Sequence, residues 1–402
     1  MSFTQKEKRL FWQMSSAMFL GGFAIFFLLY TTQPLFPIFS EQFGASPALA
    51  SLSLSVTTGV LAIVMLVTAG MAEQFGKKQM MTLSLLLSSF FTVCCAFSPT
   101  FGVLILFRVL LGISIAGLPA IAMAYIAEEF PPRMLGLAMG LYLAGNTIGG
   151  MTGRILTGML ADFFNWNIAL FFVGSLAFLC GIVFWKLLPK QKRHHLRIRM
   201  NIREMFHPLI DHLQNARLLC LYGLAFLLMG GFVTLYNYIT YELLGEPYHL
   251  SHSAVSWIFL LYIMGTISSA VMGRLADRIG RMFVLIIGLC LMLGGILLTL
   301  FSQLMLKIIA IALFTYGFFS CHTVASSSVG INAKDHKAHA SSLYLLFYYT
   351  GSSIFGSFGG IFWGKFGWYG ITCYISALIL GGFLLAFCLQ YMRIQEKKSS
   401  ET

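Results

Sequence analysis

Long runs without a charged side chain dominate this chain. Cutting the sequence at every Asp, Glu, Lys and Arg leaves twelve charge-free windows of 19 or more residues. About 20 apolar residues cross a bilayer as a helix, so the pattern predicts twelve membrane-spanning helices. The windows are continuously apolar rather than alternating, which argues against a membrane β-barrel. The windows are 10–40, 42–72, 79–107, 109–127, 134–153, 163–185, 218–241, 247–273, 282–306, 308–333, 338–364 and 366–392.

One long polar stretch, 189–217, separates the sixth window from the seventh and predicts a linker between two sets of six helices. The composition agrees, since 58% of the 402 residues are hydrophobic and only 10% are charged, which leaves no room for a large soluble domain. The predicted parts are an N-terminal segment 1–13, a six-helix bundle 14–188, the basic linker 189–217, a second six-helix bundle 218–391 and a C-terminal segment 392–402.

The net charge of +12 would suit nucleic-acid binding, but the basic residues follow the pattern of the windows. If the N-terminus lies inside, then among the lysines and arginines between the windows only Lys307 and Lys365 fall on the outer side. This asymmetry is the positive-inside signature, so both termini and the linker are expected in the cytoplasm, and nucleic acid is not an expected partner. The first window is longer than the hydrophobic region of a signal peptide and lacks a small-residue cleavage site, so it is expected to remain as the first helix.

A short polar motif recurs at the same place in both halves. The segment AGMAEQFGKK (69–78) comes at the end of the second predicted span, and GRLADRIGR (273–281) at the end of the eighth. Acid, glycine and base are repeated at an offset of 204. The repeat predicts two homologous bundles. Acids at these span ends could meet bases or helix N-termini in only one conformational state, so the motifs are candidate gates. The gating candidates are Glu73, Gly76, Lys77, Asp277, Arg278, Gly280 and Arg281.

These motifs carry a family resemblance over residues 14–391. GRLADRIGR resembles the loop signature of the major facilitator superfamily, and Arg108 to Gly112 (RVLLG) resembles its R-x-x-x-G signature. GNTIGG (145–150) resembles the antiporter signature G-P-x-x-G-G, with Asn146 in place of the proline. The first loop departs from the family pattern at Ala69, Glu73 and Gln74. Within the superfamily, the chain looks most like the twelve-span drug/proton antiporter group and its bacterial inner-membrane exporters.

The resemblance implies an all-α membrane fold of two pseudo-symmetric six-helix bundles that work by alternating access, in a monomer of the bacterial inner membrane. It implies proton-coupled export of small organic molecules such as drugs or metabolites. Proton-coupled uptake or exchange of an organic anion is the alternative. No catalytic constellation or phosphate-binding G-x-x-x-x-G-K-[ST] loop occurs in the sequence, so neither an enzyme nor an ATP-driven pump is expected. The eight cysteines lack metal-ligand spacing, and no cofactor is expected.

Three ionisable residues lie deep in the predicted spans, where a charge is costly and is by default a functional candidate. Arg108 and Arg154 could offer planar forks to a carboxylate or phosphate. Alternatively, Arg108 hydrogen-bonds backbone carbonyls and Arg154 pairs with Asp162. His322 could carry the coupled proton, because histidine titrates near neutrality, or could be a buried imidazole bound to a Ser or Thr.

Polar and aromatic side chains complete the predicted pocket, because their rings and polar atoms suit an amphipathic ligand. A role in the core or in an interfacial belt is the alternative for each, and Trp12, Trp166, Trp185, Trp363 and Trp368 occupy belt positions. Pro34, Pro37 and Pro119 are expected to bend their spans. The further substrate or coupling candidates are Asn146, Tyr30, Tyr236, Asn237, Tyr262 and Tyr348.

Overall fold

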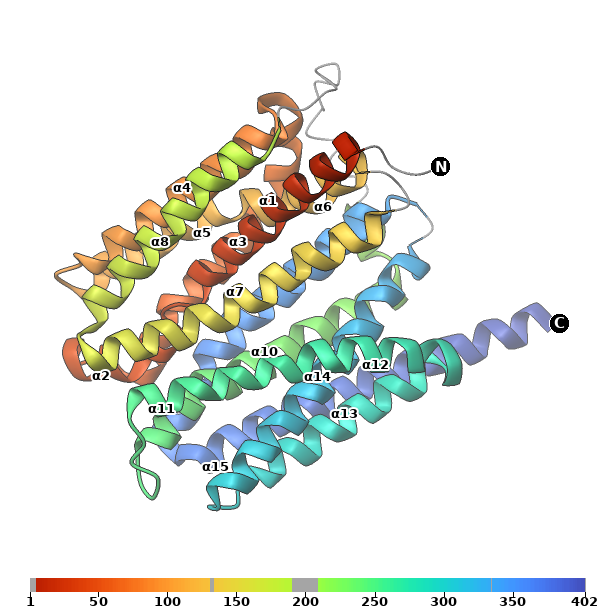
Figure 1. Cartoon of the computed structure of the whole chain (residues 1–402). Helices are drawn as coiled ribbons and strands as arrows, with labels where there is room; N and C mark the ends of the chain where they lie inside the picture. The colour runs from red at the N-terminus through yellow and green to blue at the C-terminus, as the bar shows by residue number, and fades with distance from the viewer. Residues whose placement is uncertain (1–4, 131–133, 190–208, 334, 402) are drawn as a thin grey trace. The chain divides into compact units, whose positions relative to one another are not determined.

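A computed structural model of the chain describes residues 5–130, 134–189, 209–333 and 335–401. Every regular element in these ranges is a helix (Figure 1). Most of the predicted linker lies outside them. The first-half helices are α1 (Gln5–Leu29), η1 (Gln33–Leu35), α2 (Phe36–Phe43), α3 (Pro47–Phe75), α4 (Lys77–Ala96), α5 (Phe101–Ile115), α6 (Gly117–Glu129), α7 (Leu135–Phe163) and α8 (Trp166–Leu187). The second-half helices are α10 (Ala216–Leu244), α11 (His252–Ser256), η3 (Trp257–Tyr262), α12 (Ile263–Ile279), α13 (Arg281–Leu298), α14 (Leu304–Asn332) and α15 (Lys337–Glu401).

Twelve membrane crossings account for these helices. Ten segments are long and apolar enough to span a bilayer, and one of them, His339–Gln395, is long enough for two crossings. Gly367 divides it, because its left-handed φ of 57° interrupts α15. The remaining crossing is α7, whose glycines, Asn146 and Arg154 make it less apolar. The prediction of an all-α membrane fold with twelve helices is confirmed.

Proline positions explain two of the breaks within a crossing. Pro34 lies in η1 and Pro37 at the start of α2, so the first crossing changes direction after α1. Pro119 lies in the first turn of α6, just beyond the boundary with α5 at Ala116. Proline lacks the N–H that would continue the helical ladder, so these breaks fall where the sequence predicts bends.

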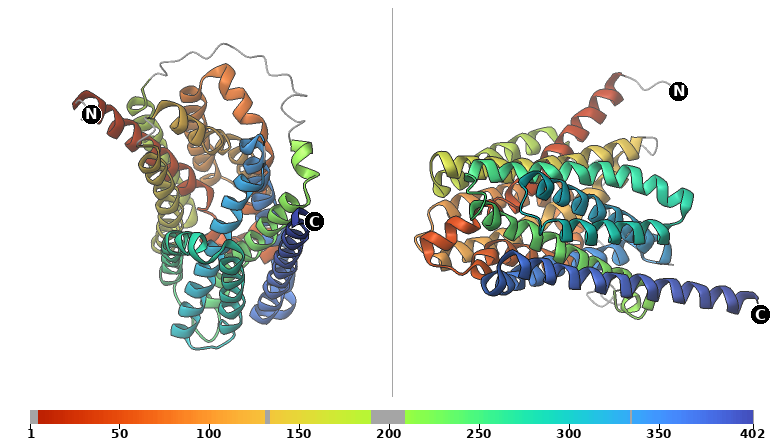
Figure 2. Two further views of the ribbon diagram at one scale, coloured as in Figure 1. Left: turned by 90° about the vertical axis from the view of Figure 1, so that its right-hand side faces the viewer. Right: turned by 90° about the horizontal axis from the view of Figure 1, so that it is seen from below.

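The chain forms two compact units, and each takes a short segment from the other half. The first unit comprises Met1–Ala45, Leu52–Met200 and Ser251–Ser256, and the second Ser46–Ser51, Asn201–Leu250 and Trp257–Thr402. Within each unit the long helices run alongside one another (Figures 1 and 2). In the first unit α1 packs extensively on α7, and in the second α10 packs on α15.

A glycine stripe allows α7 to approach α1 closely. Gly145, Gly149 and Gly153 each lie against a backbone carbonyl group of α1, at Phe19, Phe23 and Phe27 in turn. Without Cβ atoms, the two backbones come nearer than any other residue would permit. The pairing recurs in the second unit, where Gly351 of α15 lies against the carbonyl group of Phe226 of α10.

The glycines of the repeated loop motif also adopt matching conformations. Gly76 precedes α4 with φ 91° and ψ 132°, and Gly280 precedes α13 with φ 99° and ψ 140°. Residues with a Cβ atom are strained at these positive φ values, whereas glycine is not. This explains why glycine occupies the same place in both motifs. The two halves therefore share backbone geometry as well as sequence at this motif.

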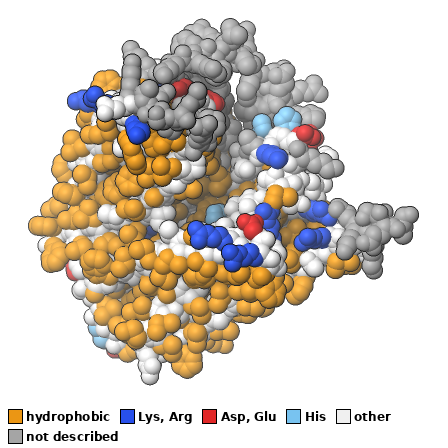
Figure 3. Space-filling model, turned by 45° about the vertical axis from the view of Figure 1, so that its right-hand side comes forward, with side chains coloured by type: hydrophobic (Ala, Val, Ile, Leu, Met, Phe, Trp, Pro, Cys, Tyr) orange, Lys and Arg blue, Asp and Glu red, His pale blue; other side chains and the backbone are white. Residues whose placement is uncertain are grey.

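Apolar side chains cover much of the outer surface. Figure 3 shows broad areas of hydrophobic side chains on the visible face, with Lys and Arg in separate groups. Large apolar residues such as Ile63, Phe163 and Leu384 expose more than half of their area. Such a surface is stable in lipid rather than in water.

Candidate functional site

Arg154 is the centre of a buried polar cluster in the first unit. Only 1% of its side chain is exposed. Its Nε donates to Oε1 of Gln33 at 2.6 Å, and its Nη1 donates to the carbonyl oxygen of Gly150 at 2.8 Å. The Tyr30 ring lies under the guanidinium, with its centroid 3.9 Å from Cζ. Two hydrogen bonds and a cation–π contact therefore fix the plane of this cation.

The break after α1 positions this cluster. Tyr30 lies in the turn between α1 and η1, and Gln33 begins η1, where a regular helix would have pointed both side chains elsewhere. Arg154 and Gly150 are one turn apart on α7. The sequence identified Arg154 and Tyr30 as candidates, and the structure brings them together.

Arg108, also 1% exposed, hydrogen-bonds to backbone carbonyl groups, which is the structural role that the sequence left open for it. Its Nη2 donates to the carbonyl oxygen of Leu29 at 2.8 Å, and its Nε donates to the carbonyl oxygen of Ser53. Thr57 in turn donates to the carbonyl oxygen of Arg108 at 2.9 Å. The fork joins α5 to α1 and α3, so its first role is to satisfy backbone acceptors where helices break or meet. A requirement for Arg108 in transport stays a prediction.

Asn146 lies at the interface of α1 and α7 rather than in a polar cluster. Its side chain packs against Gly22 of α1, where an added Cβ would also meet the carbonyl oxygen of Tyr142 at 3.0 Å. The residue therefore belongs to the same close interface as the glycine stripe. This is a packing role for the position that replaces the proline of the antiporter signature.

His322 of α14 lies in an aromatic cluster of the second unit. Its Nδ1 is 2.9 Å from the hydroxyl oxygen of Tyr344 on α15. The Tyr348 ring centroid is 4.9 Å from that of the imidazole, and Phe318 is stacked at 6.0 Å. The hydrogen-bond partner is thus a tyrosine, not the Ser or Thr of the sequence-based alternative. A proton on this imidazole would change both its hydrogen bond and its ring contacts.

The cluster continues along α10. Phe232 stacks on Phe318 at 4.0 Å, and Tyr236 lies 4.6 Å from Tyr262, measured between ring centroids. The Tyr236 hydroxyl is 2.8 Å from Oγ1 of Thr315. The sequence analysis missed Phe232, Phe318 and Thr315. Their spacing, with Phe232 four residues before Tyr236 and Phe318 four before His322, was the signal available in the sequence.

Asn237 bonds to the backbone of α15. Its Nδ2 donates to the carbonyl oxygen of Gly356 at 3.3 Å, and Tyr238 donates to the same oxygen at 2.9 Å. Both side chains therefore join α10 to α15. Neighbouring residues on a helix point about 100° apart, which explains why Tyr236 and Asn237 have different surroundings.

The gating candidates divide into different environments. Lys77 is 3% exposed, and its Nζ lies 2.5 Å from both carboxylate oxygens of Glu128, so it joins α4 to the end of α6 within the first unit. Asp277 is largely exposed and lies 3.8 Å from Arg281 one turn later. Arg278 is exposed. The side chain of Glu73 lies outside the described residues, and gating by these motifs stays a prediction.

A second buried ion pair lies in the second unit. Lys307 of α14 is 2% exposed and its Nζ lies 2.5 Å from Oε1 of Glu242 on α10. Tyr248 and Trp368 present their rings to the same ammonium at 4.9 and 5.2 Å. The belt position predicted for Trp368 is wrong, since its indole is buried and donates to Thr299. A buried indole needs such an acceptor for its N–H.

Trp166 corrects the predicted belt in the same way. Its ring is buried in the first unit against Phe39 and Phe43, and its Nε1 donates to Oε1 of Gln42. Trp12 and Trp185 each expose more than half of their area, as residues of a belt do. Composition and position along a span could not separate these two groups.

Comparison with known proteins identifies the fold. The family model described as Major Facilitator Superfamily matches residues 18–242 and residues 218–402. The chain belongs to the Major Facilitator Superfamily. It is therefore a multi-pass membrane transporter and not an enzyme, as the sequence motifs predicted.

Relatives of this superfamily transporter extend over its whole length. The protein named "Uncharacterized MFS-type transporter YybF" of Bacillus subtilis (strain 168) is 42% identical over 402 residues, covering 100% of this chain and 99% of the relative. The "Inner membrane transport protein YnfM" of Escherichia coli (strain K12) is 41% identical over 370 residues, covering 92% of this chain and 88% of the relative. The crystal structure of the nucleoside transporter NupG superposes with a TM-score of 0.77 at 14% identity, covering 94% of this chain and 99% of that one. The structural likeness concerns the fold alone.

Proposed function

We propose that this transporter exports a small organic molecule in exchange for protons, and that the molecule carries an acidic group beside an apolar body. The surroundings of Arg154 carry the proposal. A guanidinium is permanently charged, and here Gln33 and Tyr30 hold its plane before any ligand arrives. A fixed fork in a region of low dielectric binds a carboxylate more strongly than a mobile one in water.

Within the second unit, the aromatic cluster around His322 is the basis for proposing an apolar body in the ligand and for proposing proton coupling. Rings of Phe318, Tyr236 and Tyr348 offer a large apolar area with hydroxyl groups at its edge, which suits an amphipathic molecule. Histidine is the side chain whose unperturbed pKa, about 6.5, lies nearest to neutrality, which makes the imidazole of His322 a candidate proton carrier. We propose it as the coupling group.

The direction of transport rests on the resemblance of residues 145–150 to the antiporter signature. The close packing of this segment on α1 is consistent with a role in the conformational cycle. Arg154 would serve equally in the second candidate function, proton-coupled uptake or exchange of an organic anion. Direction is therefore measured separately from binding.

A thermal-shift screen tests the acidic group. The purified protein is heated with a panel of amphipathic carboxylic acids and their methyl esters, because a ligand that binds only the folded state raises its unfolding temperature. We expect an acid to stabilise the protein and its ester to fail. Arg154→Gln should abolish the rise in unfolding temperature, and Arg154→Lys should show little of it, because an ammonium lacks the planar fork. Lys365→Gln, which removes an exposed base, is the control and should respond like the parent chain. Equal stabilisation by acid and ester, or an unaltered response of Arg154→Gln, would contradict the proposal.

Proteoliposomes with a known orientation test coupling and direction, using an acid found in the screen. Movement of the acid against an imposed pH gradient indicates antiport, whereas movement with the protons indicates the uptake alternative. His322→Gln stays polar but does not titrate, so exchange should persist and pH-driven accumulation should disappear. Tyr344→Phe, which removes only the hydrogen-bond partner, should keep coupling with a changed pH profile. Accumulation by His322→Gln would move the coupling group elsewhere, with Glu242 and Asp162 examined next.

A further inference from the structure

A basic hollow lies within the second unit, separate from the aromatic cluster. It has a volume of about 530 Å³ and is bounded by the starts of α10 and α13 and by the last parts of α12, α14 and α15. Ligand sites in proteins commonly have volumes of about 300–1,000 Å³. The hollow is therefore large enough for a small ligand or the headgroup of a lipid.

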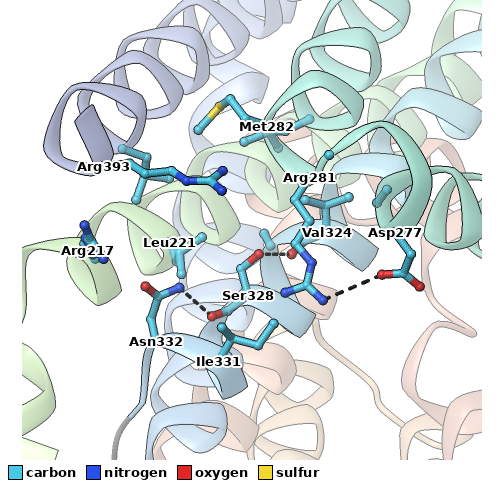
Figure 4. Close-up of a pocket in the computed structure, with 15 residues that line it drawn as sticks. Arg217, Leu221, Asp277, Arg281, Met282, Val324, Ser328, Ile331, Asn332 and Arg393 are labelled. Carbon is cyan, nitrogen blue, oxygen red and sulfur yellow. Dashed lines mark hydrogen bonds and ion pairs between the residues drawn. The ribbon is translucent and has the colours of Figure 1, made fainter. Parts of the chain in front are cut away.

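Three arginines from three helices line this hollow. Arg217 is the second residue of α10, Arg281 begins α13 and Arg393 lies near the end of α15. Figure 4 shows Arg393 extending from α15 over the hollow, with Arg281 reaching toward Asp277 at its side. Asp277 is the one acid among the lining residues, so the lining carries two net positive charges.

Contacts within the unit hold two of these arginines. Arg217 donates from Nη2 to the carbonyl oxygen of Met392 at 3.4 Å, which joins the start of α10 to the end of α15. Arg281 lies 3.8 Å from Asp277, and both are partly or largely exposed. An exposed pair at this distance is weak, so an anion with more charge can compete for Arg281.

The backbone adds to the positive potential. α13 begins at Arg281, and its N-cap Gly280 provides no side-chain hydrogen bond to the first turn. The N–H groups of a first helical turn attract anions. Apolar side chains, Leu221, Leu285 and Leu389 among them, also line the hollow. The hollow therefore combines cationic and apolar side chains.

We propose that this hollow binds a phosphate-bearing anion, either the headgroup of an anionic phospholipid or a soluble phosphate ester. Arginine forks match phosphate oxygens in geometry and charge, and several of them can bind one phosphate. The loop between α12 and α13 and the end of α15 are expected on the cytoplasmic side, where anionic lipids and phosphate esters are both present. The site is distinct from the proposed transport site, so either proposal can fail without the other.

Thermal unfolding of the full-length protein in neutral detergent tests the proposal with four additives. These are phosphatidylglycerol, phosphatidylcholine, glycerol phosphate and sodium chloride at matched ionic strength. We expect a saturable rise in unfolding temperature with phosphatidylglycerol, glycerol phosphate or both, and none with phosphatidylcholine or chloride. A response to phosphatidylglycerol alone assigns the site to lipid, and a saturable response to glycerol phosphate assigns it to soluble esters.

Two variants and a matched control locate the effect. Arg281→Gln and Arg393→Gln should each weaken binding about tenfold, because each removes a charge-assisted contact. Arg274→Gln removes the same charge from α12 without lining the hollow, and should bind as tightly as the parent chain. Arg393 is exposed near a helix end, so its variant is expected to fold. No response to any phosphate, or equal weakening by Arg274→Gln, would overturn the proposal.

Discussion

Replacing Gly149 by alanine should separate α1 from α7. A Cβ built at Gly149 lies 2.7 Å from the carbonyl carbon of Phe23, whereas ordinary van der Waals contact begins at 3.4 Å. The deficit of about 0.7 Å falls on backbone atoms, which no rotamer change can move. Overpacking of this kind costs about 1–3 kcal/mol, against a gain of up to about 1 kcal/mol from the higher helix propensity of alanine. After the full propensity gain is subtracted, we expect a net loss of up to about 2 kcal/mol.

Gly140→Ala is the matched control, because Gly140 lies on the same helix and a Cβ there meets no atom within 4 Å. It should gain up to about 1 kcal/mol from helix propensity alone. Unfolding temperatures of the purified proteins should therefore rank Gly140→Ala at or above the parent chain, and Gly149→Ala below it. Equal unfolding temperatures for the two variants would refute the reasoning, since the contact with α1 is the main difference between the two sites.

Two buried cations give further predictions. Glu128→Gln should destabilise the first unit by about 1–3 kcal/mol, because Lys77 would keep its charge without its counter-ion. Urea or thermal unfolding measures this loss, with Glu129→Gln as the control. Stability equal to that of the control would contradict it. Arg108→Lys should lower both the unfolding temperature and the transport rate, because one ammonium cannot bridge the two carbonyl groups that the guanidinium joins. Normal values in both assays would contradict a role for the guanidinium.

Sequence predicted the fold because membrane insertion imposes strong local constraints. Each crossing requires about 20 apolar residues, and the position of basic residues encodes an expected topology. The repeated glycine at 76 and 280 could be identified for a similar reason, since its backbone conformation excludes most side chains. These properties depend on short stretches of chain, which can be interpreted without knowing their neighbours.

Candidate residues could be named from sequence, but their partners could not. Arg108 and Arg154 look alike in the sequence, as two arginines within apolar helices. Only the packed helices give Arg108 two backbone carbonyls and Arg154 a glutamine and a tyrosine ring. The local cost of a buried charge marks both positions, whereas the choice of partner depends on which helices lie beside them.

Tertiary structure alone also brought the basic hollow and the buried tryptophans into view. The hollow joins arginines that lie 64 and 112 residues apart in the chain, Arg217, Arg281 and Arg393. In the sequence each is one more basic residue on the side where basic residues are expected, so nothing there groups the three. Trp368 matched a belt position by its place along the chain, yet packs inside its unit. Hydrophobicity determines which segments enter the membrane, while helix packing determines which faces meet, and contacts between distant residues follow only from the second.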